Sequence, residues 1–305
     1  MTPWRADLFV QPLPGYVAWM SPAPRLLIAA ALLLSACSAG ASQKEEEHDR
    51  FPTSKDFTTD VMARAAFTAG GATPWRLSAL ETPRAKPAAW RIVVVTGTPS
   101  WSEYWAPTLA KIGPDREMIV ADRPGFAESE PQTAVTSIEA QAEALEPMLG
   151  DNDGQKVILI GQSYGGPIAT VLAARRPDKV KALVLMSAFF GDRGPTIRRL
   201  SALGSLVRPA LPRDMKNALA EIDHQKPQLP RARTALAGLA IPVIVLHGDR
   251  DTFITPADAR RLAVAAGPRA QFMEAPGGDH FLNACCVDSV LGAVDRGIAA
   301  AESGT

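Results

Sequence analysis

The chain contains 305 residues, of which 47% are hydrophobic and 21% are charged. This composition excludes wholesale disorder, because it supplies enough apolar surface for a core. The formal net charge is zero, so the chain as a whole attracts neither nucleic acid nor an anionic membrane surface. No internal repeat is found, and the length suits one large domain.

An apolar run near the N-terminus predicts a sorting signal. Residues 26–36 (LLIAAALLLSA) follow Arg25 and end at Cys37. Eleven residues are too few for a helix that crosses a membrane, which needs about 20. A short apolar segment behind a basic residue is typical of a secretory signal. The alternative is a buried N-terminal helix.

The end of this run resembles the lipobox of bacterial lipoproteins. The matching residues are Leu34, Ser35, Ala36 and Cys37. The resemblance implies that Cys37 is acylated, becomes the first residue of the mature chain and anchors it to a membrane. Ser38, which follows, implies the outer membrane if the source is a bacterium with two membranes.

These features divide the N-terminal region into a signal segment, 1–37, and a flexible tether, 38–58. Within the signal segment, Met20 is a better start than Met1, because an acidic residue and two prolines lie where a short basic region is expected. Residues 38–50, which begin the tether, are small, polar and acidic in composition. The folded domain is therefore expected to occupy 59–305.

Strand-like and helix-like patterns alternate through this domain. Continuous apolar, β-branched runs predict strands, and helical spacing lies between them. This alternation predicts a mostly parallel, doubly wound α/β sheet. The expected strands are 92–96, 118–121, 156–160, 182–186, 243–247 and 270–273, with one or two edge strands around 75–81. The expected helices are 101–112, 137–149, 165–175 and 256–266.

A long insertion interrupts the alternation. Residues 191–240 have helical spacing broken by prolines and are too long for an ordinary loop. We expect a helical cap over the strand ends.

The pattern G-x-S-x-G follows the strand expected at 156–160 and precedes a helix. It is formed by Gly161, Gln162, Ser163, Tyr164 and Gly165. A sharp strand-to-helix turn of this kind lifts a serine hydroxyl out of the sheet. The helix N-terminus beside it supplies N–H groups and partial positive charge for an oxyanion. An ordinary glycine-rich turn is the alternative interpretation.

An acid and a histidine follow in the order serine, acid, histidine that suits a hydrolase triad. Asp249 and Asp251 come after a later strand, and His280 follows the last strand. His280 therefore lies in the loop that would deliver a general base. The neighbouring Asp279 is expected to be a solvent-facing turn residue.

Together these motifs resemble the α/β-hydrolase superfamily over roughly residues 90–300, apart from the cap. In that family G-x-x-D followed by proline presents the acid, which implies Asp251 rather than Asp249, because Gly248 and Pro256 match the pattern. Further matching segments are 97–100 and 122–126. The resemblance implies oxyanion donors at the backbone N–H groups of Thr98 and Tyr164. Thr96 departs from the family, where histidine is common.

The other histidines are expected to be structural. His48 lies in the tether, His224 lies in the cap, and His247 ends a strand, where it is expected to fill space beside the acid loop.

Besides Cys37, the chain has one adjacent pair of cysteines, Cys285 and Cys286. Their spacing matches no metal site. Two alternatives remain, a vicinal disulfide and a pair of buried thiols. We favour the thiols, because adjacent side chains on a helix point about 100° apart.

The sequence thus predicts a serine hydrolase that cleaves a carboxylic ester or similar small acyl substrate, without metal or other cofactor. Ser163 is expected to attack, His280 to act as base and Asp251 to orient it. By resemblance, a serine nucleophile argues against the haloalkane dehalogenase and epoxide hydrolase branches, which use aspartate. Alternatives are a carbon–carbon or other acyl hydrolase on the same triad, and a non-catalytic binding lipoprotein. The expected location is the bacterial cell envelope, lipid-anchored to the outer membrane and facing the periplasm.

Overall fold

The computed structural model of the chain describes residues 62–150, 154–191 and 195–304. The signal segment, lipidation site and tether predicted for 1–58 lie outside the described residues, as does His48.

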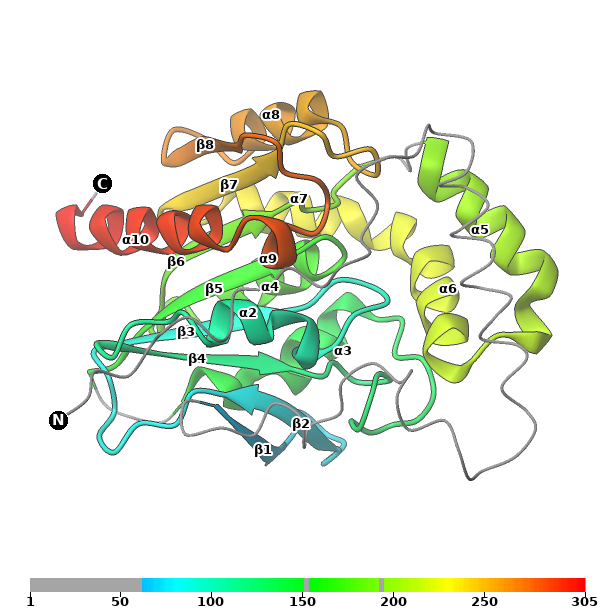
Figure 1. Cartoon of the computed structure of the whole chain (residues 1–305), viewed down its shortest axis with the longest axis horizontal. Coiled ribbons are helices and arrows are strands. Elements are labelled where there is room, and N and C mark those ends of the chain that lie inside the picture. Colours follow the sequence, from blue (N-terminus) through cyan, green and yellow to red (C-terminus); the bar gives the residue numbers. More distant parts are fainter. Residues whose placement is uncertain (1–61, 151–153, 192–194, 305) are drawn as a thin grey trace, which may run out of the picture. The chain divides into compact units, whose positions relative to one another are not determined.

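Within these described residues, eight strands form one sheet in the order β1-β2-β4-β3-β5-β6-β7-β8 (Figure 1). The pairs β1–β2 and β2–β4 are antiparallel, and all other neighbours are parallel. This confirms the mostly parallel α/β sheet and the edge strands. The strands are β1 (Ala63–Thr68), β2 (Arg76–Glu81), β3 (Trp90–Val95), β4 (Arg116–Ala121), β5 (Lys156–Gln162), β6 (Val180–Met186), β7 (Val243–Gly248) and β8 (Ala270–Ala275).

The central strands are buried on both faces, as continuous apolar runs predict for a parallel sheet. Alternate side chains of β3 point to opposite sides, so that Val93 belongs to one core cluster and Ile92 to another. Two separate apolar cores therefore hold two helical layers against the sheet.

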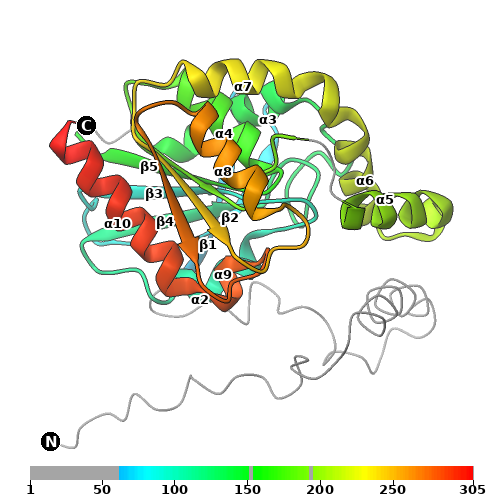
Figure 2. The same cartoon turned by 90° about the horizontal axis from the view of Figure 1, so that it is seen from above.

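One layer contains α3 (Ile138–Ala144), α4 (Gly165–Arg175), α7 (Leu229–Ala237) and α8 (Pro256–Ala265). The opposite layer contains a 3-10 turn, η1 (Ser102–Trp105), then α2 (Ala106–Leu109), α9 (Leu282–Cys285) and α10 (Val287–Ser303). Figure 2 shows the two layers on either side of the sheet. Among the described residues, no helix has both the length and the apolar character that crossing a membrane requires.

Two of the predicted helices are shorter than expected. The segment 101–112 contains only η1 and α2. The segment 137–149 forms α3, which begins with the side chain of Ser137 capping the N–H of Ala140, and then a 3-10 turn, η2 (Glu146–Leu149). Pro147 explains this division, because proline has no N–H to continue the α-helical hydrogen bonds.

The inserted segment is mostly helical in its described part. It comprises α5 (Pro195–Val207), η3 (Arg208–Ala210), α6 (Arg213–Gln225), η4 (Lys226–Gln228) and α7. Helices α5 and α6 lie beyond the carboxyl ends of the parallel strands (Figure 1). Helix α7 instead packs on α4, through buried residues such as Ala232 and Leu236. We use the word cap below for α5 to η4.

Candidate active site

Ser163 lies in the turn between β5 and α4 with an unusual backbone conformation. Its φ angle is +49°, in the left-handed region that non-glycine residues rarely adopt. The turn is held by hydrogen bonds from the Ser163 N–H to the carbonyl of Met186 and from the Phe189 N–H to the carbonyl of Ser163, both 3.0 Å. Backbone strain maintained by surrounding structure is typical of a nucleophile elbow.

Glycine is required beside this turn because the chain segments approach closely. A Cβ atom on Gly165 would lie 2.2 Å from the carbonyl oxygen of Val95, which no side chain tolerates. A Cβ atom on Gly97 would lie 3.1 Å from the Cβ of Ser163. The loop after β3 therefore lies directly against the serine.

The structure brings together the three residues predicted to form the triad. The Ser163 hydroxyl lies 3.1 Å from Nε2 of His280, and Nδ1 of His280 lies 2.8 Å from Oδ2 of Asp251. The acid comes from the loop after β7 and the histidine from the loop after β8. These loops touch at Gly248, where a Cβ atom would lie 2.3 Å from the carbonyl oxygen of Gly278.

Asp251 is buried and held by its own loop. Its Oδ1 accepts hydrogen bonds from the N–H groups of Phe253 at 2.8 Å and Ile254 at 3.0 Å, which leaves Oδ2 to face His280. Burial raises the pKa of Asp251, but hydrogen bonds from His280 and the backbone outweigh it, and the net pKa lies below the usual value. The carboxylate is thus kept ionised next to the imidazole.

The neighbouring acids are placed differently. Asp249 is exposed, and in the described part of the chain the carboxylate bonded to His280 is that of Asp251. Asp279 is also exposed, and its carboxylate accepts a hydrogen bond from the N–H of Phe281. Geometry therefore favours Asp251 over Asp249 as the partner of the histidine, and Asp279 is a turn residue.

His247 is fully buried at the end of β7. Its Nε2 lies 3.1 Å from the carbonyl oxygen of Ile254 and 3.6 Å from Oδ2 of Asp251. Burial lowers the pKa of His247, and the nearby Asp251 carboxylate only partly opposes this. The neutral imidazole therefore fills space beside the acid loop. His224 is exposed on α6, with Nδ1 close to the carbonyl oxygen of Ala220.

The two N–H groups expected to stabilise an oxyanion come from opposite sides of Ser163. Thr98 follows Gly97 in the loop after β3, and Tyr164 precedes α4. Within the described ranges neither N–H group is bound to another part of the protein. Both N–H groups are therefore available to a ligand.

Aromatic residues surround the histidine, which the sequence motifs did not indicate. The ring of Phe253 stacks on the His280 ring with centroids 4.9 Å apart, and Phe281, which is 51% exposed, packs edge-on against both. Phe253 also contacts a small apolar cluster of Phe189, Leu229 and Ile254, which joins the insertion to the acid loop. The only feature of the sequence that pointed to Phe253 was its position two residues after Asp251.

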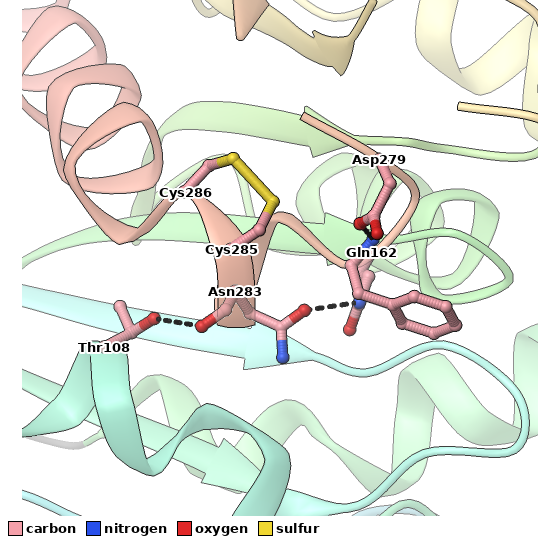
Figure 3. Close-up of a disulfide and its surroundings, with 7 residues drawn as sticks. Thr108, Gln162, Asp279, Asn283, Cys285 and Cys286 are labelled. Atoms are coloured by element: carbon pink, nitrogen blue, oxygen red, sulfur yellow. Dashed lines mark hydrogen bonds between the residues drawn. A yellow bond between two sulfur atoms is a disulfide. The ribbon is translucent and has the colours of Figure 1, made fainter. Parts of the chain in front are cut away.

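Cys285 and Cys286 form a vicinal disulfide, so the expectation of two buried thiols was wrong (Figure 3). Cys285 is exposed and Cys286 half-buried. The argument from helical geometry failed because the pair spans a junction. Cys285 ends α9, whereas Cys286 has φ −139° and ψ 44° and precedes α10. Among the residues that the structure describes, no group of three or more potential metal ligands is found.

A family model described as the alpha/beta hydrolase fold matches residues 91–220. Lipase LipV of Mycobacterium tuberculosis is 32% identical over 110 residues, which are 36% of this chain and 41% of the lipase. A 2-hydroxy-6-oxononadienedioate/2-hydroxy-6-oxononatrienedioate hydrolase of Cupriavidus pinatubonensis is 24% identical over 77% of this chain and 88% of its own. The chain thus spans about two fifths of the first relative's length and most of the second.

Solved structures give the same fold. A thermophilic esterase from Thermogutta terrifontis superposes with a TM-score of 0.63 at 20% identity, over 78% of this chain and 98% of that one.

Proposed function

Because this chain has the α/β-hydrolase fold and a family model of that fold matches residues 91–220, we propose that it is a serine hydrolase acting on carboxylic esters or similar acyl substrates. One observation carries the proposal. The Ser163 hydroxyl, the His280 imidazole and the Asp251 carboxylate form a continuous hydrogen-bonded chain from three separate loops. Such a chain activates a serine hydroxyl toward carbonyl carbon.

In the proposed first half-reaction Ser163 attacks the substrate carbonyl. The Nδ1–H of His280 donates to Asp251, so its Nε2 accepts the serine proton as the bond forms. Ionised Asp251 stabilises the resulting imidazolium. The negative charge on the carbonyl oxygen is stabilised by the N–H groups of Thr98 and Tyr164. The leaving alcohol takes the proton from His280, and an acyl-enzyme remains.

In the second half-reaction water replaces the alcohol. His280 Nε2 removes a proton from water as it attacks the acyl carbonyl, and then returns that proton to the Ser163 oxygen when the carboxylic acid leaves. The cycle needs no redox change and regenerates the free enzyme.

The surroundings of the triad favour an acyl or alcohol group of apolar character. Phe253 and Phe281 lie against His280, and Phe253 also contacts the buried cluster that contains Phe189 and Leu229. Ligand sites combine such apolar walls with few polar groups. The cap lies over the same strand ends, and we expect it to set chain-length preference. Unchanged ester chain-length profiles in variants across α5 and α6 would contradict this role.

A carbon–carbon bond hydrolase is the second candidate. The relative from Cupriavidus pinatubonensis, which aligns with 77% of this chain, is named as a hydrolase of 2-hydroxy-6-oxononadienedioate, and this name supports the second candidate. The same three residues would serve either reaction, so the two candidates differ only in the substrate bound. Turnover of a vinylogous 1,5-diketone, measured beside p-nitrophenyl esters, would separate them.

Labelling with a fluorophosphonate probe tests the proposal without knowledge of the substrate. The probe should label the wild type at Ser163, identified by peptide mass, and should not label folded Ser163→Ala or His280→Ala. Absence of labelling in the folded wild type would favour a binding lipoprotein without turnover.

We further propose that Cys37 carries a lipid anchor that holds the domain in the bacterial cell envelope. The lipobox-like residues Leu34 to Cys37 support this proposal.

A further inference from the structure

Arg123 is buried, and each N–H donor of its side chain has a hydrogen-bond acceptor in the protein. Its side chain is completely buried, in the loop after β4. A guanidinium has five N–H groups, and those of Arg123 meet five acceptor atoms. These are the carbonyl oxygens of Thr96 (2.9 Å) and Gly97 (2.7 Å), both carboxylate oxygens of Glu221 (2.6 and 3.0 Å) and the amide oxygen of Gln141.

The bond to Gly97 bears directly on an oxyanion donor. The carbonyl of Gly97 and the N–H of Thr98 belong to one peptide unit, and the cis peptide bonds of the described chain lie elsewhere. In a planar trans peptide the C=O and N–H groups point in opposite directions. Fixing the Gly97 oxygen toward Arg123 therefore aims the Thr98 N–H away from the guanidinium. Donation to the oxygen from a cation also polarises the peptide and strengthens the N–H as a donor.

Arg123 also contacts the residue that supplies the second donor. Its guanidinium carbon lies 5.2 Å from the ring centroid of Tyr164 and 4.7 Å from that of Phe126. The same group thus contacts the peptide unit that carries one proposed donor and the ring of the residue that supplies the other.

The charge that balances Arg123 comes from the cap. Glu221 lies on α6, is completely buried, and makes a two-pronged ion pair with Arg123. Its Oε1 also accepts from Nε2 of Gln141 on α3 at 2.6 Å. A buried cation that loses its only carboxylate partner is strongly disfavoured. The hydrogen bonds of Arg123 therefore depend on α6 packing against the loop after β4.

We propose that Arg123 is a positioning residue that orients the Thr98 N–H toward the oxyanion. Glu221 makes this orientation depend on how the cap packs against the rest of the domain. The inference rests on the proposed function. Substitutions that break the Arg123–Glu221 ion pair should therefore weaken binding of the transition state more than binding of the substrate. Loss of an ion pair with a purely structural role would not have this selective effect.

The test uses p-nitrophenyl butyrate and its thionoester with the full chain and the Arg123→Lys and Glu221→Gln variants. Lysine keeps the charge but cannot bond all five acceptors. Glutamine keeps the size but removes the charge. We expect kcat to fall roughly 10- to 100-fold with little change in KM, since loss of one oxyanion donor costs about 10²- to 10³-fold. The preference for the oxoester should also fall, because sulfur is a poorer acceptor and benefits less from an intact oxyanion site.

The matched control is a second arginine–glutamate pair. Arg91 and Glu117 form a largely buried ion pair at the amino ends of β3 and β4, remote from the strand ends that carry Ser163. Arg91→Lys and Glu117→Gln should lower the unfolding temperature but leave kcat and the oxoester preference unchanged.

Wild-type values of kcat and oxoester preference in a folded Arg123→Lys or Glu221→Gln variant would overturn the inference. If Arg123→Lys does not fold, Glu221→Gln decides. If the folded wild type hydrolyses neither ester and is not labelled by fluorophosphonate, the proposed function fails instead, so the two failures are distinguishable.

Discussion

Gln162, directly before Ser163, is bonded to Asn283, three residues after His280. The Gln162 Nε2 donates to Oδ1 of Asn283 at 3.0 Å, and both side chains are buried (Figure 3). The Asn283 Nδ2 in turn donates to the carbonyl of Tyr104 at 2.7 Å. These two bonds fix the end of β5, which leads into Ser163, relative to α9, which follows His280.

Removing this link should cost stability and some activity. Asn283→Ala removes the acceptor of the buried Gln162 Nε2 and the bond to the Tyr104 carbonyl, so we expect the free energy of unfolding to fall by about 1–3 kcal/mol. Looser placement of His280 should lower kcat. Urea unfolding and p-nitrophenyl ester kinetics measure the two effects. Gln155→Ala is the control, because Gln155 is a buried amide just before the amino end of β5 that donates to the carbonyl of Ala88 and should affect stability without a comparable loss of kcat.

The triad should show a hierarchy. By analogy with a characterised triad, Ser163→Ala and His280→Ala should each lower kcat by about 10⁶-fold, and Asp251→Asn by roughly 10⁴-fold, because the acid orients and stabilises the base. Asp249→Asn and Asp279→Asn should keep most activity. All five are compared by ester hydrolysis after circular dichroism has confirmed folding. Full activity in Ser163→Ala would refute the mechanism, whereas an inactive Asp249→Asn beside an active Asp251→Asn would refute only the assignment of the acid.

His247 should make stability depend on pH. Its pKa in the folded protein is below the ordinary value of 6.5, so below that pH the unfolded chain binds more protons than the native one. The free energy of unfolding should therefore decrease as pH falls through about 6.5, by at most about 1.4 kcal/mol per pH unit. Urea unfolding between pH 5 and 8 should show a shallower dependence in His247→Gln. His224→Gln, which removes an exposed histidine, is the control, and an equal slope in wild type and His247→Gln would contradict the prediction.

The vicinal disulfide should be detectable by thiol titration. In a Cys37→Ser background Cys285 and Cys286 are the only cysteines. The denatured protein should give no free thiol before reduction and two afterwards. Replacing both cysteines with serine should change the unfolding temperature little, because a bond between adjacent residues closes almost no loop of chain. Two thiols before reduction would indicate the dithiol form.

The proposed lipid anchor on Cys37 predicts how the protein partitions into detergent. Wild-type protein expressed in a bacterium should enter the detergent phase of Triton X-114, because an acylated cysteine adds buried hydrocarbon. Cys37→Ser should remain in the aqueous phase, while Cys285→Ser should partition like the wild type. Equal aqueous partitioning of wild type and Cys37→Ser would rule out the anchor.

The sequence by itself determined the alternation of the central strands with helices along the chain and the position of the nucleophile turn, but not the last two helices, α9 and α10. Continuous apolar runs at β3, β5, β6 and β7 distinguish buried parallel strands from the helices between them. The Ser163 turn was recognisable because its constraints are local, since strand, glycine and helix follow one another within a few residues. Helix lengths were less predictable, as the break at Pro147 shows.

The tertiary structure decided which distant residues meet. Arg123 and Glu221 are 98 positions apart and Gln162 and Asn283 are 121 apart, and no local pattern marks either pair. The cysteine pair was misjudged for the related reason that its geometry depends on where α9 ends. Periodicity and turn chemistry act over a few residues, whereas the pairing of buried charges and amides depends on how separate elements pack.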